Sequence, residues 1–207
     1  MQKESKLAIE WNKFLQGDRD SFQNIYNANF RSLFLYALRF TTDDELIKDV
    51  IHNIFITFWE KRGTIKEVKN PTVYLHRSVR NELLNLKRQQ NKYAVDSLTE
   101  DSYSFDFELP IEAHIVREEE LKETRQHLKA AFENLTERQK EILYLKYVKG
   151  MSFEEIAYTI GITLKASYKL HARAIIAIRE NFGNNGYTIA FLVSIYFYHI
   201  NGITTQT

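Results

Sequence analysis

Residues 152–163 read SFEEIAYTIGIT, and they carry the most specific local pattern in the chain. Ser152 and Glu155 have the spacing of a capping box, which predicts the start of a short helix. Ala157 is a small residue inside that helix, and Gly161 follows four residues later. Two helices cross closely only over a small side chain, and the turn between them needs a residue that can adopt positive φ. The pattern therefore predicts a helix-turn-helix.

A longer helix is predicted to begin at Thr163 and to cover residues 164–180. Basic and histidine side chains lie on its predicted outer face, at Lys165, Lys169, His171 and Arg173. An ordinary helical hairpin would contain the same turn. The basic outer face favours a DNA-binding helix-turn-helix, because such a helix enters the major groove between two rows of phosphates.

The composition of the whole chain also favours helices. The 207 residues include 2 Pro and 7 Gly, too few for the many tight turns of a β-sandwich or barrel. With 44% hydrophobic and 27% charged residues, the chain resembles a soluble globular protein with one ordinary core or two small ones. The absence of cysteine excludes a disulfide framework, a Cys-ligated zinc site and a thiol nucleophile, and it fits a cytoplasmic location. Residues 1–10 lack the apolar core of a signal peptide.

Four amphipathic helices are predicted before residue 93, because apolar residues recur there at spacings of three and four. They cover residues 5–16, 21–40, about 45–61 and 71–90. Thr42 and Glu45 have the form of a capping box for the third helix, and Asn70 followed by Pro71 predicts the start of the fourth. The third helix places an apolar stripe on one side and polar residues on the other.

Charge divides the chain into three blocks. Lys and Arg outnumber Asp and Glu by 16 to 11 in residues 1–92, the reverse holds by 10 to 3 in residues 93–127, and residues 128–207 have 9 against 6. Much of the excess positive charge of residues 1–92 lies between Lys69 and Lys92. This basic stretch is either a surface for a polyanion or a solvated helix face. Residues 94–112 show no sustained helical period, and they are predicted to be an acidic linker.

Beyond the linker, helices are predicted over residues 113–133 and from a capping box at Thr136 and Gln139 to Gly150. The predicted fold class is all-α, with two helical domains joined by a flexible acidic linker. The predicted boundaries are 1–92 for the first domain, 93–112 for the linker, 113–182 for the second domain and 183–207 for an apolar tail. The uncharged stretch 187–200 is shorter than the roughly 20 residues that span a bilayer. It is expected to pack within the chain or to bind a partner.

A basic helical block, an acidic linker and a helix-turn-helix together resemble the sigma factors of bacterial RNA polymerase, in particular the extracytoplasmic-function (ECF) group. The resemblance covers about residues 10–181. Three stretches carry it: DVIHNIF at 49–55 with FWE at 58–60, YLHRSVRN at 74–81 with Asn85 and Arg88, and LTERQ at 135–139 through Arg173-Ala174. They are similar to the family's region 2.2, its regions 2.3 and 2.4, and its region 4. The resemblance implies that the protein directs promoter recognition, DNA melting and transcription initiation.

The resemblance also implies partners and sites. Core polymerase would bind through two of its elements, the clamp coiled coil of its largest subunit and the flap. Asp49, His52 and Asn53 would contact the clamp coiled coil. Here His52 and Asn53 replace the family's usual Gln and Glu. Promoter DNA would be the second partner, and an anti-sigma protein or another regulator is a further candidate.

Two sets of DNA contacts follow from the same resemblance. The residues implied at the minus-10 element are Arg77, Arg80, Asn81, Lys87 and Arg88, and Tyr74 stands where the family usually has Trp, either stacking on a base or packing in the core. The residues implied at the minus-35 element are Lys165, Tyr168, Lys169, Ala172 and Arg173. The recognition helix departs from the common family pattern, so promoter preference does not transfer.

Two other classes of function compete with this one. A stand-alone helix-turn-helix regulator would explain residues 135–174, but it leaves the basic helix at 71–90 and the face around Asp49 without a role. An enzyme is the least favoured, since the sequence has no paired carboxylates at metal spacing, no Gly-rich phosphate loop and no nucleophile motif. No catalytic residue, metal, cofactor or small-molecule substrate is therefore predicted.

Overall fold

A computed structural model describes residues 6–65, 68–91, 103–106 and 130–182. The chain forms two compact units, Met1–Ser104 and Phe105–Thr207, and each is considered by itself. Every regular element within the described ranges is helical, and no strand occurs in them. The prediction of an all-α chain with two helical domains is confirmed.

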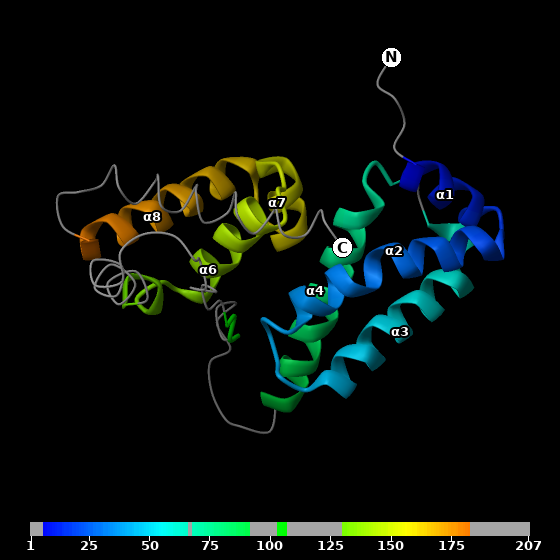
Figure 1. The fold of residues 1–207 in the computed structure, drawn as a ribbon, viewed down its shortest axis with the longest axis horizontal. Helices are drawn as coiled ribbons and strands as arrows, with labels where there is room; N and C mark the ends of the chain where they lie inside the picture. The colour runs from blue at the N-terminus through cyan, green and yellow to red at the C-terminus, as the bar shows by residue number, and fades with distance from the viewer. Residues whose placement is uncertain (1–5, 66–67, 92–102, 107–129, 183–207) are drawn as a thin grey trace, which may run out of the picture. The chain divides into compact units, whose positions relative to one another are not determined.

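Within its described residues, the first unit is built from four α-helices, which are labelled in Figure 1. They are α1 Lys6–Leu15, α2 Arg19–Ala37, α3 Asp44–Lys61 and α4 Pro71–Asn91, with a short 3-10 turn, η1 Arg62–Thr64, after α3. Helices α2, α3 and α4 pack against one another in pairs, and α1 packs mainly along α2. The four helices correspond to the four that apolar periodicity predicts.

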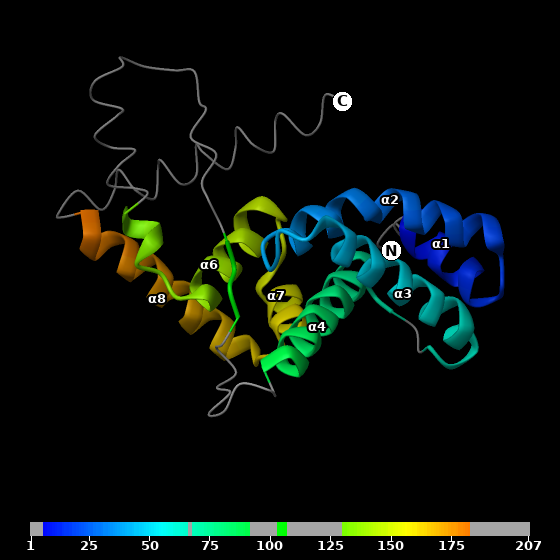
Figure 2. The ribbon, with the colours of Figure 1, turned by 90° about the horizontal axis from the view of Figure 1, so that it is seen from below.

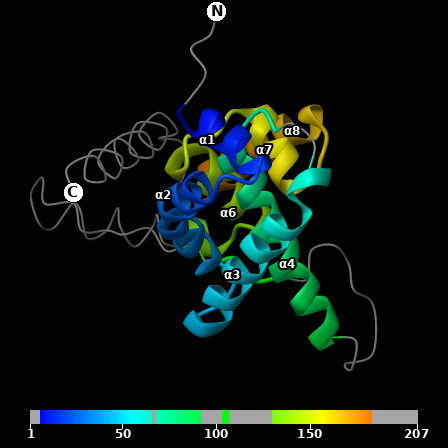
Figure 3. The ribbon, with the colours of Figure 1, turned by 90° about the vertical axis from the view of Figure 1, so that its right-hand side faces the viewer.

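Aromatic rings join α1 to the rest of this unit. Trp11 is buried, and its ring makes edge-on contacts with Phe14, Phe58 and Tyr74 at centroid distances of 5.2, 6.0 and 5.9 Å. Phe58 and Tyr74 also stack on each other at 5.3 Å. These contacts fix α1 against α3 and α4, whose arrangement is seen from the side in Figure 3. Tyr74 thus packs in this aromatic cluster.

The start of α3 differs from the prediction. Asp43, not Thr42, is the N-cap, and its carboxylate accepts a hydrogen bond from the Leu46 N–H at 3.0 Å. Glu45 does not close a capping box but pairs with Lys48 at 2.6 Å. An ionised carboxylate is a stronger acceptor than a hydroxyl at a helix N-terminus, so Asp43 takes the capping position.

The helix α4 starts as predicted. The Asn70 side chain accepts a hydrogen bond from the Val73 N–H at 3.4 Å, and Pro71 is the first helical residue. A proline at this position has no N–H to leave unpaired, and its fixed φ suits the first turn. The start of the basic helix is therefore set by local sequence.

Several helical elements of the second unit lie within the described residues and are labelled in Figure 2. They are α6 Glu137–Leu143, a π-helical turn η2 Tyr144–Val148, α7 Phe153–Ile160 and α8 Leu164–Phe182. Residues 130–133 are also helical, but the rest of the helix predicted over 113–133 lies outside the described residues. Helices α6 and α7 both pack on α8. The capping boxes Thr136–Gln139 and Ser152–Glu155 are both present as predicted.

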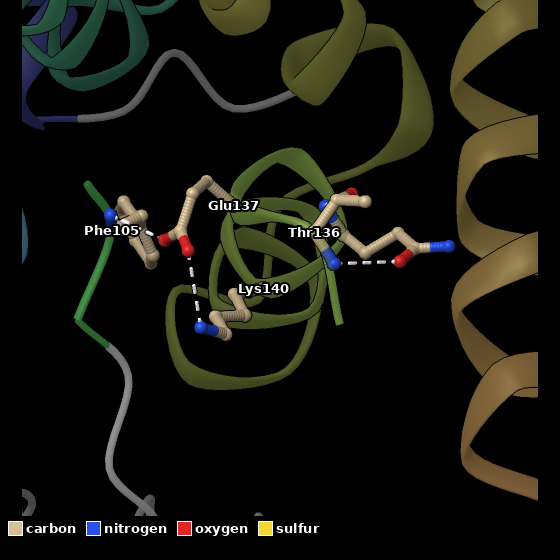
Figure 4. A network of polar contacts seen from close by, with 5 residues as sticks. Phe105, Thr136, Glu137 and Lys140 are labelled. Carbon is tan, nitrogen blue, oxygen red and sulfur yellow. Dashed lines mark hydrogen bonds and ion pairs between the residues drawn. The ribbon is translucent and has the colours of Figure 1, made fainter. Parts of the chain in front are cut away.

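The segment Tyr103–Asp106 lies within the predicted linker and has no helical structure. Phe105 is nevertheless buried in the second unit, where its ring contacts Tyr144 edge-on at 5.7 Å. Its backbone N–H donates to the Glu137 carboxylate at 2.5 Å, and the same carboxylate accepts from Lys140 at 3.2 Å (Figure 4). The side chain of Phe105 therefore completes the core beside α6.

Candidate nucleic-acid and polymerase interfaces

The outer face of α3 carries the residues expected to bind polymerase. Asp49, His52 and Asn53 are all exposed, and Ile56 beside them is 55% exposed. Residues at these spacings share one side of a helix. The opposite side is buried in the unit, through Ile47, Val50, Ile51, Ile54, Phe55 and Phe58. The structure therefore brings the three predicted residues together around an apolar side chain.

His52 is held in position by α2. Its Nε2 lies 2.6 Å from the hydroxyl of Tyr26, and the two rings stack with centroids 5.8 Å apart. The ring of Phe30 stacks on His52 as well, at 6.3 Å. Burial raises the pKa of Tyr26, so its hydroxyl keeps its proton at neutral pH. The imidazole is thus oriented on the exposed face of α3.

The residues of α4 that are predicted to contact the minus-10 element divide into two groups. Asn81 and Arg88 are exposed and Arg77 is half-buried, and the spacings of four and seven place all three on one side of the helix. Arg80 and Lys87 lie about a quarter-turn away, closer to the packed side. Lys92 lies outside the described residues. Only part of the predicted minus-10 set therefore forms one open surface.

Arg80 is buried. The residue is only 4% exposed, and its guanidinium lies 5.5 Å from the centre of the Tyr103 ring. Tyr103 is 6% exposed, and it also stacks on Phe40 at 5.7 Å. A guanidinium over an aromatic face is stabilised by the negative potential of the ring. Contact between Arg80 and DNA would therefore require Tyr103 to move.

The exposed side of α8 carries all five residues predicted to contact the minus-35 element. Lys165, Tyr168, Lys169, Ala172 and Arg173 are each exposed. The buried side of the helix consists of Ser167, Ala174 and Ile178. The hydroxyl of Ser167 donates to the Leu164 carbonyl at 2.7 Å and lies 3.3 Å from that of Phe153, at the start of α7. One side of α8 thus packs in the second unit, and the opposite side is exposed to solvent.

The turn between α7 and α8 has the predicted geometry. Gly161 has φ +79° and ψ 37°, and its N–H donates to the Ala157 carbonyl at 3.0 Å. Ala157 is buried where the two helices approach. Thr163 accepts a hydrogen bond from the Ala166 N–H at 3.2 Å and so caps α8. The helix-turn-helix is confirmed.

Replacing Gly161 by alanine should lower the free energy of unfolding of the second unit by about 1–2 kcal/mol. A Cβ at this position would meet no atom within 4 Å, so the cost comes from positive φ alone. Chemical denaturation followed by circular dichroism measures it. Gly161→Asn is the matched control, because asparagine adopts positive φ more readily. An equal cost for both variants would contradict this explanation.

Several contacts were not predicted from the sequence. Phe153 at the start of α7 packs on Tyr168 with centroids 4.2 Å apart, and it contacts His171 edge-on at 5.2 Å. Tyr147 lies in the π-helical turn, and its hydroxyl lies 3.0 Å from His171 Nε2. Burial lowers the pKa of His171, and the charge of Lys146 lowers it further. The histidine is therefore neutral at pH 7 and adds no charge to α8.

The sequence analysis also missed the two buried aromatic residues of the linker, Tyr103 and Phe105. Their alternation with polar residues is the signal that could have revealed them.

No group of three or more His, Asp or Glu side chains is arranged in the described part of the chain to hold a metal ion. None of the helices in these ranges combines the length and the apolar character needed to cross a membrane. The exposed surfaces of α3, α4 and α8 carry the predicted site residues that the structure describes.

Two family models match the chain, one for each unit. The model of Sigma-70 region 2 matches residues 25–93, which include α3 and α4. The model of Sigma-70, region 4 matches residues 125–178, which include α6, α7 and most of α8. Together the matches cover both predicted DNA-contacting surfaces. No curated protein matches the sequence.

Solved structures show the same fold. CnrH, solved in complex with the cytosolic domain of CnrY, is 18% identical with a TM-score of 0.56, over 84% of this chain and 95% of that chain. The sigma factor RpoE of Bartonella quintana, solved in complex with the anti-sigma factor NepR, is also 18% identical with a TM-score of 0.53. That match covers 79% of this chain and 98% of the other. At this identity the likeness concerns the fold.

Proposed function

Because the chain belongs to the sigma-70 family and has the ECF-type combination of regions 2 and 4, we propose that it binds core RNA polymerase and opens specific promoters. In this proposal, the α3 face of Asp49, His52 and Asn53 docks on the clamp coiled coil. Helix α4 contacts the unpaired strand of the minus-10 element, and α8 lies in the major groove at the minus-35 element. The chain needs no catalytic residue of its own, since opening DNA requires captured bases and neutralised phosphates and makes no bond.

One observation carries the proposal most directly. All five residues assigned to the minus-35 element are exposed together on α8, the second helix of a helix-turn-helix whose turn contains a left-handed glycine. Lys165, Lys169 and Arg173 add three positive charges to this surface, and no acidic residue occurs between residues 156 and 179. A surface of this charge suits the DNA backbone. The separate polar face of α3 supports a protein partner, which a stand-alone regulator would not need.

Run-off transcription with purified bacterial core polymerase tests the proposal. We expect transcripts that start at defined sites only when the protein is added. A stand-alone regulator would leave core polymerase inactive, whereas it would still bind DNA alone. The absence of specific initiation, together with failure to bind core polymerase, would reject the proposal in favour of that alternative.

Replacing Asp49 by alanine should weaken binding to core polymerase about three- to fivefold. The carboxylate is exposed on the proposed docking face, and a rim charge usually contributes up to about 1 kcal/mol. Fluorescence anisotropy of labelled protein titrated with core polymerase measures the affinity. Asp20→Ala is the control, because Asp20 is exposed in the first turn of α2, away from this face. Unchanged affinity in Asp49→Ala would count against the docking assignment.

An anti-sigma protein is the regulatory partner that we propose. The similar sigma factor RpoE was solved in complex with the anti-sigma factor NepR, and the similar protein CnrH was solved in complex with the cytosolic domain of CnrY. Since both proposed partners, core polymerase and promoter DNA, are found in the bacterial cytoplasm, we expect the protein to act there. Identification of proteins that co-purify with the chain from its native cell tests for this partner.

A further inference from the structure

The exposed side of α8 carries two parallel rows of side chains. One row is apolar and consists of Leu164, Tyr168, Ala172 and Ile176, four residues apart, all of them exposed. The other row is basic and consists of Lys165, Lys169 and Arg173, each one position after a member of the apolar row. Residues four apart lie on neighbouring turns of one face, so both rows wind slowly along the helix. The recognition surface is therefore half apolar.

Tyr168 is the largest side chain of the apolar row, and its ring is fixed. The residue is 49% exposed, yet its ring centroid lies only 4.2 Å from that of Phe153. Phe153 is itself held between His171, at 5.2 Å, and the ammonium of Lys146, 4.7 Å from its centroid. A ring already held in one orientation loses little entropy when it binds. Tyr168 therefore presents a preformed apolar edge.

The chemistry of the major groove limits what such an edge can recognise. Three of the four bases present only hydrogen-bond donors and acceptors there, whereas thymine also presents a C5 methyl group. Alanine and aromatic side chains gain by contact with that methyl, and a lysine or arginine does not. The basic row beside the edge suits phosphates or the acceptors of guanine, which supplies the charge complementarity that DNA requires.

We propose that Tyr168 and Ala172 read a thymine methyl in the minus-35 element, and that Phe153 is the residue that positions Tyr168. The inference rests on the proposed function, because it requires α8 to lie in the major groove. It assigns the apolar row to base recognition and the basic row to backbone and purine contacts. The promoters of this protein should therefore contain at least one thymine, on either strand, whose methyl group contributes to binding.

The test uses the holoenzyme and a minus-35 element selected from a randomised promoter library. Each thymine of the selected element is replaced in turn by deoxyuridine, which removes only the methyl group. At one position we expect the substitution to weaken holoenzyme binding about fourfold, the effect of losing one buried methyl. In Tyr168→Ala the preference for thymine should fall well below fourfold, because only Ala172 then contacts the methyl, and in Tyr168→Phe the preference should persist because the ring remains.

Two control variants separate this inference from its alternatives. Lys169→Ala should weaken binding to thymine and uracil templates by the same factor, since it removes a charge and leaves the apolar edge. Phe153→Ala should reduce the preference for thymine, while circular dichroism checks that the helices remain. A selected element without thymine, or a thymine preference that is unchanged in Tyr168→Ala, would overturn the inference.

The alternative occupant of the apolar row is an acidic helix of a protein partner. If the wild-type holoenzyme binds both templates equally and initiates normally, the apolar row does not contact DNA and the inference is wrong, although the proposed function stands. If the holoenzyme does not form or does not initiate, the proposed function itself fails. The two failures are therefore distinguishable in one set of reactions.

Discussion

Replacing Asn81 by alanine should lower the formation of open promoter complexes about tenfold, while binding to core polymerase stays unchanged. Asn81 is exposed on α4, on the same side as Arg77 and Arg88. An amide can donate to and accept from the edge of an unpaired base, and one such contact contributes about 1–3 kcal/mol. The loss of about 1.4 kcal/mol corresponds to a tenfold change in the equilibrium.

Two measurements on the same preparation check this expectation. Permanganate reactivity of unpaired thymines reports the open complex, and anisotropy with core polymerase reports assembly. Asn27→Ala is the matched control, because Asn27 is an exposed asparagine on α2, a different helix of the same unit. Open complexes unchanged in Asn81→Ala, or lowered equally in both variants, would remove Asn81 from the minus-10 site.

Local signals in the sequence were sufficient to predict the helix-turn-helix. Ser152 and Glu155 satisfy each other's backbone groups, and Gly161 alone in its segment tolerates the left-handed turn. These interactions span three or four residues, so a short pattern contains all the information they need. The same holds for the exposed residues of α8, which follow from helical periodicity once the start of the helix is known.

Interactions between distant segments were not predictable in this way. The linker is acidic and aperiodic, yet Tyr103 and Phe105 within it are buried against the first and second unit respectively. Burial of an aromatic side chain removes about 150–250 Å² of surface from water. The free energy gained in this way can hold the ring in place even though its neighbours in sequence are polar. The contact of Arg80 with Tyr103, 23 positions later, is one that no pattern in α4 indicates. The sequence spacing also allows either Thr42 or Asp43 to be the N-cap of α3, and only the backbone geometry selects Asp43.

Replacing Arg80 by alanine should lower the free energy of unfolding of the first unit by about 2–3 kcal/mol. The side chain is almost fully buried, and its guanidinium lies over the Tyr103 ring. The variant loses the packing of a long side chain and a desolvated cation–π contact, which contributes about 2 kcal/mol. Denaturant unfolding followed by circular dichroism measures the loss. A change below about 0.5 kcal/mol would show that Arg80 acts as an ordinary surface residue.

This stability cost means that lost transcription in Arg80→Ala would not by itself prove a DNA contact. Tyr103→Ala provides the sharper test, because it removes the cover and leaves the guanidinium. If Arg80 contacts the minus-10 strand, holoenzyme carrying Tyr103→Ala should bind a single-stranded minus-10 oligonucleotide about fivefold more tightly, since displacing the ring no longer costs free energy.

Tyr103→Phe is the control for that gain. It keeps the ring over Arg80 and should bind the oligonucleotide as the wild type does. The double variant Arg80→Ala/Tyr103→Ala should lose the gain in affinity. It lacks the Arg80 guanidinium that the Tyr103→Ala substitution alone would expose. If Tyr103→Ala instead weakens binding as much as Arg80→Ala does, both residues act by holding α4 in place, and the DNA contact assigned to Arg80 is wrong.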